Sequence, residues 1–193
     1  MRIPDNLTRP LAAAVVVALC LALTGCGDAA DTGAAAADAV NAADAEPGLA
    51  AFVLESEPGG AIPVAEARNT AQPGEAITVF GRIGAADTPF GRNYATFVLG
   101  DEAILYCDEM GDDHCPTPWD ACCEDPDKIA THRASVQFVA DGRPVEGSMH
   151  GVGGLSELDA VVVTGEVNAA STPDNLVIDA TGVFRRSALS SQP

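Results

Sequence analysis

The stretch PGEAITVFGRIG, residues 73–84, decides the fold. Its opening Pro-Gly pair marks a turn, and after it the apolar residues Ile77, Val79 and Ile83 recur with a period of two. Such alternation is typical of a β-strand that buries one face and exposes the other. The stretch therefore predicts the first strand of a β domain.

Four later segments have the same character, because they are rich in β-branched and aromatic residues and are bounded by turn signals. They are NYATFVL (93–99), ASVQFVA (134–140), DAVVVTGEV (159–167) and LVIDATGVF (176–184). Only two short helical segments are expected beside them, over 63–69 and 154–158. Five strands in about 110 residues, without a long helix, indicate a small closed or nearly closed all-β structure.

Three glycines, Gly81, Gly165 and Gly182, each lie late in a predicted strand, where glycine often marks a bulge or a barrel bend. The pieces PGEAITVFGRIG, YATFVLGD, VVVTGEV and LVIDATGV together resemble an OB-fold. That resemblance implies a small five-stranded Greek-key barrel over residues 62–186, which we expect ahead of a two-sheet sandwich. It also implies that residues 101–130 are a Cys-rich insertion between the second and third strands.

The N-terminus predicts export. Two arginines precede the apolar run 11–23, whose 13 residues are fewer than the roughly 20 needed to cross a bilayer, so the run fits a secretory signal peptide. The tetrad Leu23-Thr24-Gly25-Cys26 follows and resembles the lipobox of bacterial lipoproteins. This resemblance implies a signal peptide over 1–25 and lipid, such as palmitate, on Cys26. The protein would then be anchored to a membrane of the cell envelope, facing outside the cytoplasm. An ordinary secretory peptide or a short anchor helix is the alternative.

Alanine, aspartate and glycine make up most of residues 26–61, and branched apolar residues are few there. A segment of this composition buries too little apolar surface to offset the entropy lost on ordering. We therefore expect a flexible tether over 26–61 that leads to the barrel domain, and a polar tail over 187–193.

The chain is strongly acidic, with 28 acidic and 10 basic residues and a net charge of −18. Cleavage before Cys26 would remove one aspartate and two arginines, which leaves 27 acidic and eight basic residues and a net charge of −19. A surface of this charge repels phosphate backbones, so no nucleic-acid partner is expected. The expected partners are the membrane, through the lipid on Cys26, and another protein.

The segment CDEMGDDHCPTPWDACCE, residues 107–124, holds four of the six cysteines. Exported proteins form disulfides, and Cys122 and Cys123 are adjacent, so a bond between these two would be strained. Two pairings are left, Cys107–Cys122 with Cys115–Cys123, or Cys107–Cys123 with Cys115–Cys122. Either would close loops shorter than twenty residues and stabilise the segment by roughly 2–3 kcal/mol.

The alternative is a metal site, because four thiolates bind zinc tetrahedrally and cysteine with His114 could hold copper. The short C-x2-C spacing common in zinc sites is absent, so the sequence favours disulfides. A redox role is the least favoured, since no C-x-x-C pair occurs.

No recognisable catalytic motif occurs, so we expect a protein that is not an enzyme and has no cofactor. The first hypothesis is a disulfide-stapled lipoprotein with a structural or protein-binding role, in which Trp119 makes the contact. The second is an extracytoplasmic module that binds zinc or copper through Cys107, Cys115, Cys122 and Cys123, with His114 nearby.

Overall fold

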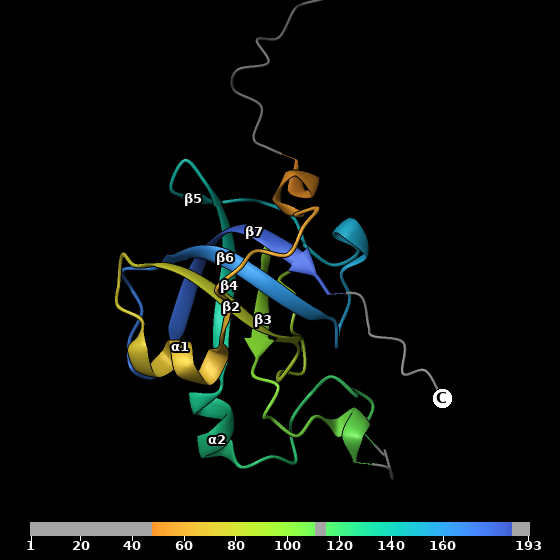
Figure 1. The fold of residues 1–193 in the computed structure, drawn as a ribbon. Helices are drawn as coiled ribbons and strands as arrows, with labels where there is room; N and C mark the ends of the chain where they lie inside the picture. Colours follow the sequence, from red (N-terminus) through yellow and green to blue (C-terminus); the bar gives the residue numbers. More distant parts are fainter. Residues whose placement is uncertain (1–47, 111–114, 187–193) are drawn as a thin grey trace, which may run out of the picture. The chain divides into compact units, whose positions relative to one another are not determined.

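The computed structural model describes residues 48–110 and 115–186, which form a β-barrel with short helices around it (Figure 1). The strands are β1 (Ile62–Pro63), β2 (Ala76–Ile83), β3 (Thr96–Gly100), β4 (Arg133–Ala140), β5 (Arg143–Pro144), β6 (Ala160–Val167) and β7 (Leu176–Arg185). The helical segments are η1 (Leu49–Phe52), α1 (Val64–Thr70), η2 (Cys107–Glu109), α2 (Pro126–Thr131) and η3 (Val152–Gly154). Within these two described ranges, no helix has the length and apolar character required to cross a bilayer.

Five strands close the barrel. β2 pairs antiparallel with β3 on one side and with β6 on the other. β3 pairs antiparallel with β4, β4 pairs parallel with β7, and β7 pairs antiparallel with β6, which completes the circuit. This strand order is that of a small OB-like Greek-key barrel, so the predicted all-β fold class is confirmed. The short strands β1 and β5 are additions that pair with β2 and β4.

The period of two in the sequence separates the inner face of each strand from its outer face. In β2 the side chains of Val79 and Ile83 are fully buried in the core, whereas Arg82 lies on the outer face. In the interior the rings of Phe97 and Phe138, from β3 and β4, lie 5.7 Å apart. Removing these apolar faces from water supplies the main driving force for closing the barrel.

Gly165 marks a bulge, as its position late in a strand predicts. The register of β6 against β7 shifts between Thr164 and Gly165, so that Thr181 in β7 is the extra residue. A Cβ atom at Gly165 would lie only 2.3 Å from the carbonyl oxygen of Asp179, so the two strands approach this closely only with glycine here. The bulge increases the local twist and helps to close the barrel.

The predicted tether over 26–61 is wrong in its last part, while its first part, like the signal peptide, lies outside the described residues. Phe52 is only 6% exposed, and its ring makes an edge contact with Phe138 at 5.2 Å between centroids. The backbone that follows bonds to β7. One short apolar patch is enough to dock residues 48–54 on the barrel, although alanine, aspartate and glycine dominate the tether as a whole.

The short helices are predicted only in part. The helix expected over 63–69 is α1, with Pro63 as its N-cap. The turn expected over 154–158 is wrong, because the helical turn in this loop is η3, which begins at a left-handed glycine. α2 is not predicted, although it has a start signal, because Asp125 accepts a hydrogen bond from the Asp127 N–H at 2.8 Å and a proline follows it.

Replacing Phe52 by alanine tests the docked segment. The loss of a buried ring from the core should lower the free energy of unfolding by about 3 kcal/mol. The measurement is a urea titration of the purified protein, with Tyr94→Ala as the control because Tyr94 is 50% exposed. Equal stability of Phe52→Ala and the control would contradict the docking of this segment.

Candidate functional site

The Cys-rich insertion connects the end of β3 to the start of β4, as predicted, and lies at one end of the barrel (Figure 1). It has a small core of its own, separate from the core of the barrel, in which Tyr106 is completely buried. The buried members of this second core are Ala85, Ile104, Tyr106 and Ala121, with Ile129 and Leu158 packed against them. Because Ala85 and Leu158 belong to barrel loops, this small core attaches the insertion to the barrel.

Two glycines at the ends of barrel strands make room for Tyr106. A Cβ atom at Gly100 would lie within 2.2 Å of the Tyr106 hydroxyl oxygen, and one at Gly84 would lie 2.6 Å from the carbonyl oxygen of Trp119. Burial raises the pKa of the Tyr106 hydroxyl above its ordinary value, so the ring stays neutral. The strand ends therefore fix where the chain enters the cysteine segment.

Arg82 fastens the insertion from the outer face of β2. Its guanidinium lies 4.4 Å from the centre of the Tyr106 ring, a favourable cation–π arrangement. The same group forms ion pairs with Asp108, at 3.0 Å, and with Glu109. Because the Arg82 side chain is only 18% exposed, these pairs are screened less than ordinary surface pairs. They hold in place the two residues that directly follow Cys107.

Backbone hydrogen bonds align the two described parts of the insertion, a first limb over residues 101–110 and a second limb over residues 115–130. The Cys107 N–H donates to the carbonyl of Asp120 at 2.9 Å, and the Asp108 N–H donates to that of Pro118 at 3.0 Å. The barrel joins this pairing, since the Ala85 N–H donates to the Trp119 carbonyl at 2.9 Å. The pairing brings the first cysteine of the segment beside the last two.

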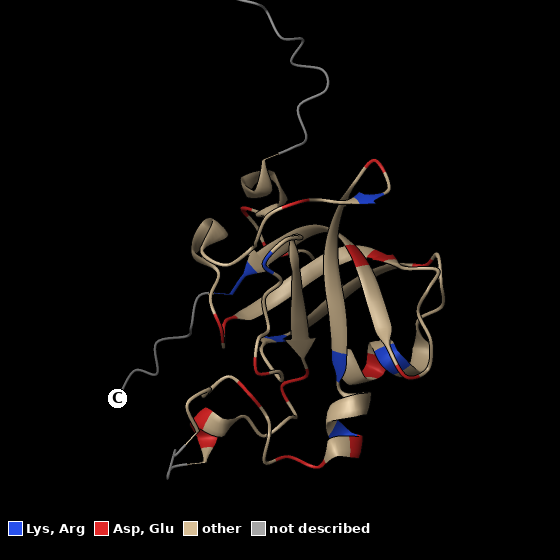
Figure 2. Cartoon of the chain, turned by 180° about the vertical axis from the view of Figure 1, so that it is seen from behind, with Lys and Arg blue, Asp and Glu red and all other residues tan. Residues whose placement is uncertain are grey.

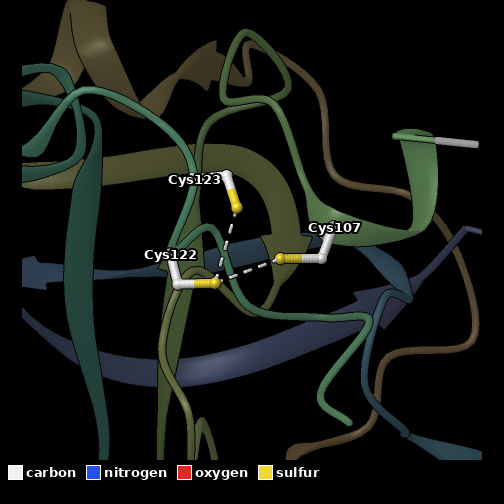
Figure 3. Close-up of side chains that lie close together, drawn as sticks. All are labelled: Cys107, Cys122 and Cys123. Atoms are coloured by element: carbon white, nitrogen blue, oxygen red, sulfur yellow. Dashed lines mark hydrogen bonds between the residues drawn. The ribbon is translucent and has the colours of Figure 1, made fainter. Parts of the chain in front are cut away.

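The thiols of Cys107, Cys122 and Cys123 point toward one another (Figure 3). The Cys122 sulfur lies 3.6 Å from the sulfur of Cys107 and 3.9 Å from that of Cys123. The sulfur of Cys115 joins the group at 3.3 Å from Cys122. All four predicted site cysteines are thus gathered around Cys122, although they are spread over seventeen residues of sequence.

These distances bear on what the sulfurs can do. Bonded sulfurs lie about 2.05 Å apart, whereas four sulfurs at about 2.3 Å from one zinc ion lie about 3.8 Å from each other. The observed 3.3–3.9 Å falls in the second range. The adjacent cysteines, which seem awkward as ligands of one ion in the sequence, direct their sulfurs to the same point. The thiols of Cys107, Cys122 and Cys123 have the donor type and the mutual spacing of ligands for a thiophilic metal ion, and the thiol of Cys115 lies beside Cys122.

The surroundings of the thiols shift their pKa values in different directions. Hydrogen bonds from the thiols of Cys122 and Cys107 lower the pKa of Cys115, and the N–H and hydroxyl of Thr117 add to this effect. The pKa of Cys122 is raised, chiefly by its contact with Cys115 and then by that with Cys107. Burial raises the pKa of Cys107. Because metal ligands must be thiolates, binding an ion at this cluster would release protons.

Glu124 ties the second limb of the insertion together just after the cysteine pair. One carboxylate oxygen accepts hydrogen bonds from Lys128 Nζ at 2.7 Å and from the Leu105 N–H at 3.0 Å. The other accepts one from the Asp125 N–H at 2.9 Å. Lys128 and these two N–H groups lower the pKa of Glu124 to about 2. The carboxylate therefore cross-links both limbs at neutral pH.

Trp119, the predicted contact residue, lies at the junction with the barrel. Its indole N–H donates to the carbonyl of Asp87 at 3.0 Å, so the side chain anchors the insertion. The half-buried ring also lines a cavity of about 300 Å³, and Phe90 and His150 line the same cavity. His114, the other predicted contact, lies outside the described residues. Arg82, Tyr106 and Glu124 are site residues that sequence analysis did not identify, because their partners are distant in sequence.

Comparison with known proteins adds no assignment of family or activity. No protein-family model matches the sequence, and a search of curated proteins finds none that is significantly similar. The functional interpretation of the site therefore depends on its own residues, which are the four thiols and the charged groups that hold them in place.

Replacing Glu124 by glutamine tests the cross-link through its pH dependence. The folded pKa of about 2 lies below the usual value of about 4.3, so the carboxylate stabilises the fold above roughly pH 4.3 and this contribution is lost as pH falls toward 2. The Glu124→Gln variant should unfold at lower urea concentration than the wild type at pH 7, and this difference should disappear near pH 2. The titrations are done with a chelator present, so that bound metal does not contribute.

The exposed carboxylate Glu102, in the same insertion, provides the control, and Glu102→Gln should unfold like the wild type. A difference between Glu124→Gln and the wild type that stays constant from pH 7 to pH 2 would contradict the assigned role of the charge.

Proposed function

We propose that the chain is an envelope lipoprotein whose barrel presents a four-cysteine centre for one thiophilic metal ion, zinc or Cu(I), outside the cytoplasm. One observation carries this proposal: the sulfurs of Cys107, Cys115 and Cys123 lie 3.3–3.9 Å from the sulfur of Cys122. This spacing suits ligands that share an ion. The protein is proposed to bind metal without catalysing a reaction.

The chemistry of the donor set favours a soft ion. Thiolates prefer zinc and Cu(I), whereas calcium and magnesium need oxygen ligands. The carboxylates of Asp108 and Glu109, which follow Cys107, are engaged by Arg82, and that of Glu124, which follows Cys123, is engaged by Lys128.

Membrane attachment comes from the lipobox-like tetrad, which lies outside the described residues. Cleavage before Cys26 and acylation of its sulfur would leave the chain on the membrane, with residues 27–47 between the lipid and the barrel. Several acyl chains are needed for stable anchoring, since one chain gives only marginal binding. The four cysteines of the insertion would then be the only thiols of the mature chain that are not lipidated.

The second candidate is a disulfide-stapled lipoprotein with a structural or protein-binding role. The observation in its favour is that Cys122 lies close to both Cys107 and Cys115, so only a small movement would form either predicted bond. An oxidising compartment would favour this outcome wherever no metal protects the thiols.

Mass spectrometry of the protein, purified without reductant, separates the two candidates. The metal centre predicts one zinc or copper ion for each chain under native conditions, and four alkylated cysteines after the ion is removed by acid and the chain is unfolded. The stapled form predicts a mass lower by four hydrogen atoms, no alkylation and no bound ion. This second result would contradict the metal centre.

Replacing Cys26 by serine tests the anchor. The variant should lose the mass of the lipid and move from the membrane fraction to the soluble fraction, because no sulfur is left to acylate at the predicted cleavage site. Cys20→Ser is the matched control, since Cys20 would leave with the signal peptide, and it should stay in the membrane fraction. A Cys26→Ser protein that remains lipidated and membrane-bound would contradict the anchor.

A further inference from the structure

The four ligands of the proposed centre differ in their exposure to solvent. Cys107 is 2% exposed and faces the barrel, and Cys115 is half-buried. Cys122 and Cys123 are exposed. One side of the centre is therefore anchored in the protein, and the other side is open to an approaching molecule.

The insertion is held together without help from an ion. Its small core, the Arg82 ion pairs and the Glu124 cross-link all lie outside the sulfur cluster. The backbone bond from the Cys107 N–H to the Asp120 carbonyl positions the buried ligand in the same way. Structural zinc sites differ in this respect, because their domains unfold when the metal leaves. Here an ion can leave while its site persists.

From these two features we propose that the ion is cargo, which the centre passes to a thiol-bearing acceptor protein by ligand exchange at Cys122 and Cys123. The inference rests on the proposed metal centre. In each exchange an acceptor thiol loses its proton to solvent and bonds to the ion as a thiolate. The sulfurs of Cys123 and Cys122 leave the ion first, and those of Cys115 and Cys107 leave last. Each takes up a proton as its bond to the ion breaks, and water fills any position that no acceptor thiol occupies. No electron is transferred, so the oxidation state of the ion does not change.

The surroundings of the centre specify a basic acceptor. Within the described parts of the insertion, residues 101–110 and 115–132, one lysine stands against eight carboxylates, and Figure 2 shows these acidic residues along the insertion and on α2. The eight are Asp101, Glu102, Asp108, Glu109, Asp120, Glu124, Asp125 and Asp127. Of these, Asp101 is buried, and Asp108 and Glu109 pair with Arg82. Lys128 is paired with Glu124. Such a surface attracts a positively charged partner and speeds its approach at low salt.

Exposed apolar side chains on the same segment provide further contact area. In the described part of the chain the large exposed apolar residues are Tyr94, Leu105 and Met110, and two of them belong to the insertion. Leu105 is 40% exposed and Met110 is 44% exposed, on either side of Cys107. An acidic surface with exposed apolar side chains on the same insertion is suited to brief docking of a protein that takes over the ion.

The experiment mixes the zinc-loaded full-length protein, in detergent, with a synthetic Cys-x-x-Cys peptide flanked either by lysines or by glutamates. Native mass spectrometry follows transfer of zinc with time. The transfer rate should rise in proportion to peptide concentration, and the lysine-flanked peptide should be about ten times faster at low salt, an advantage that should vanish in 1 M salt. A rate independent of peptide concentration, or equal rates for the two peptides, would overturn the inference.

Variants of the proposed ligands and of the acidic residues of the insertion provide a second test. Cys123→Ser should still bind zinc and release it several-fold faster, whereas Cys107→Ser should bind it much more weakly. The double variant Glu102→Gln with Asp127→Asn should slow transfer to the lysine-flanked peptide about threefold. The matched control, Asp141→Asn with Glu146→Gln, changes carboxylates near β5 at the opposite end of the barrel and should transfer at the wild-type rate. Weaker zinc binding by Cys123→Ser than by Cys107→Ser would contradict exchange at Cys122 and Cys123. Equal slowing of transfer by both double variants would contradict docking of the acceptor on the insertion.

Hydrogen exchange tests the persistence of the empty site. After zinc is removed with a chelator, the Cys107 amide should keep its protection from exchange, because its bond to Asp120 does not involve the ion. Loss of this protection would make the ion a structural one and overturn the cargo role. A protein that never binds an ion contradicts the proposed function itself, whereas one that binds zinc but fails the exchange tests contradicts only this inference.

Discussion

Tyr106 lies fully buried where the barrel meets the insertion, and its position constrains both parts. Its ring occupies the space left by glycines at the ends of β2 and β3, and Arg82 lies over the ring from outside. With Tyr106 fixed, Cys107 has little freedom, because it is the next residue and its N–H is bonded to the opposite limb. The sulfur cluster is therefore built outward from the barrel, and Cys107, its first cysteine, is also the most buried of the four.

Because Cys107 is held in place, the distances between the sulfurs decide which bonds the other cysteines can form. Cys122 and Cys123 follow a short stretch that pairs with the first limb, and they meet Cys107 at the solvent boundary. Three thiols lie 3.3–3.9 Å from the sulfur of Cys122, and this spacing suits the ion proposed above. A disulfide would instead require two sulfurs to approach to about 2.05 Å, which separates the cluster into pairs. A metal-bound cluster and a disulfide-bonded one would therefore exclude each other.

Charge connects the proposed anchor with the proposed exchange. A net charge of −19 after cleavage before Cys26 would oppose contact with anionic lipid headgroups, so a lipid on Cys26 would hold the chain at the membrane while the acidic barrel stays away from its surface. The same charge is dense around the cysteine segment, where the single lysine is already paired. Within the described residues, Arg82 and Lys128 compensate part of this charge by pairing with Asp108, Glu109 and Glu124.

By itself, the sequence determined the local features of this protein. Periodicity and turn residues identify the five barrel strands, and a late glycine predicts the bulge at Gly165, because strand alternation and glycine conformation are properties of short segments. The docking of Phe52, the role of Arg82 and the convergence of Cys107 with the Cys122–Cys123 pair are decided only in the tertiary structure. Each of these depends on contacts between residues far apart in sequence, whose geometry follows from closing the barrel and packing Tyr106, and no local pattern encodes it.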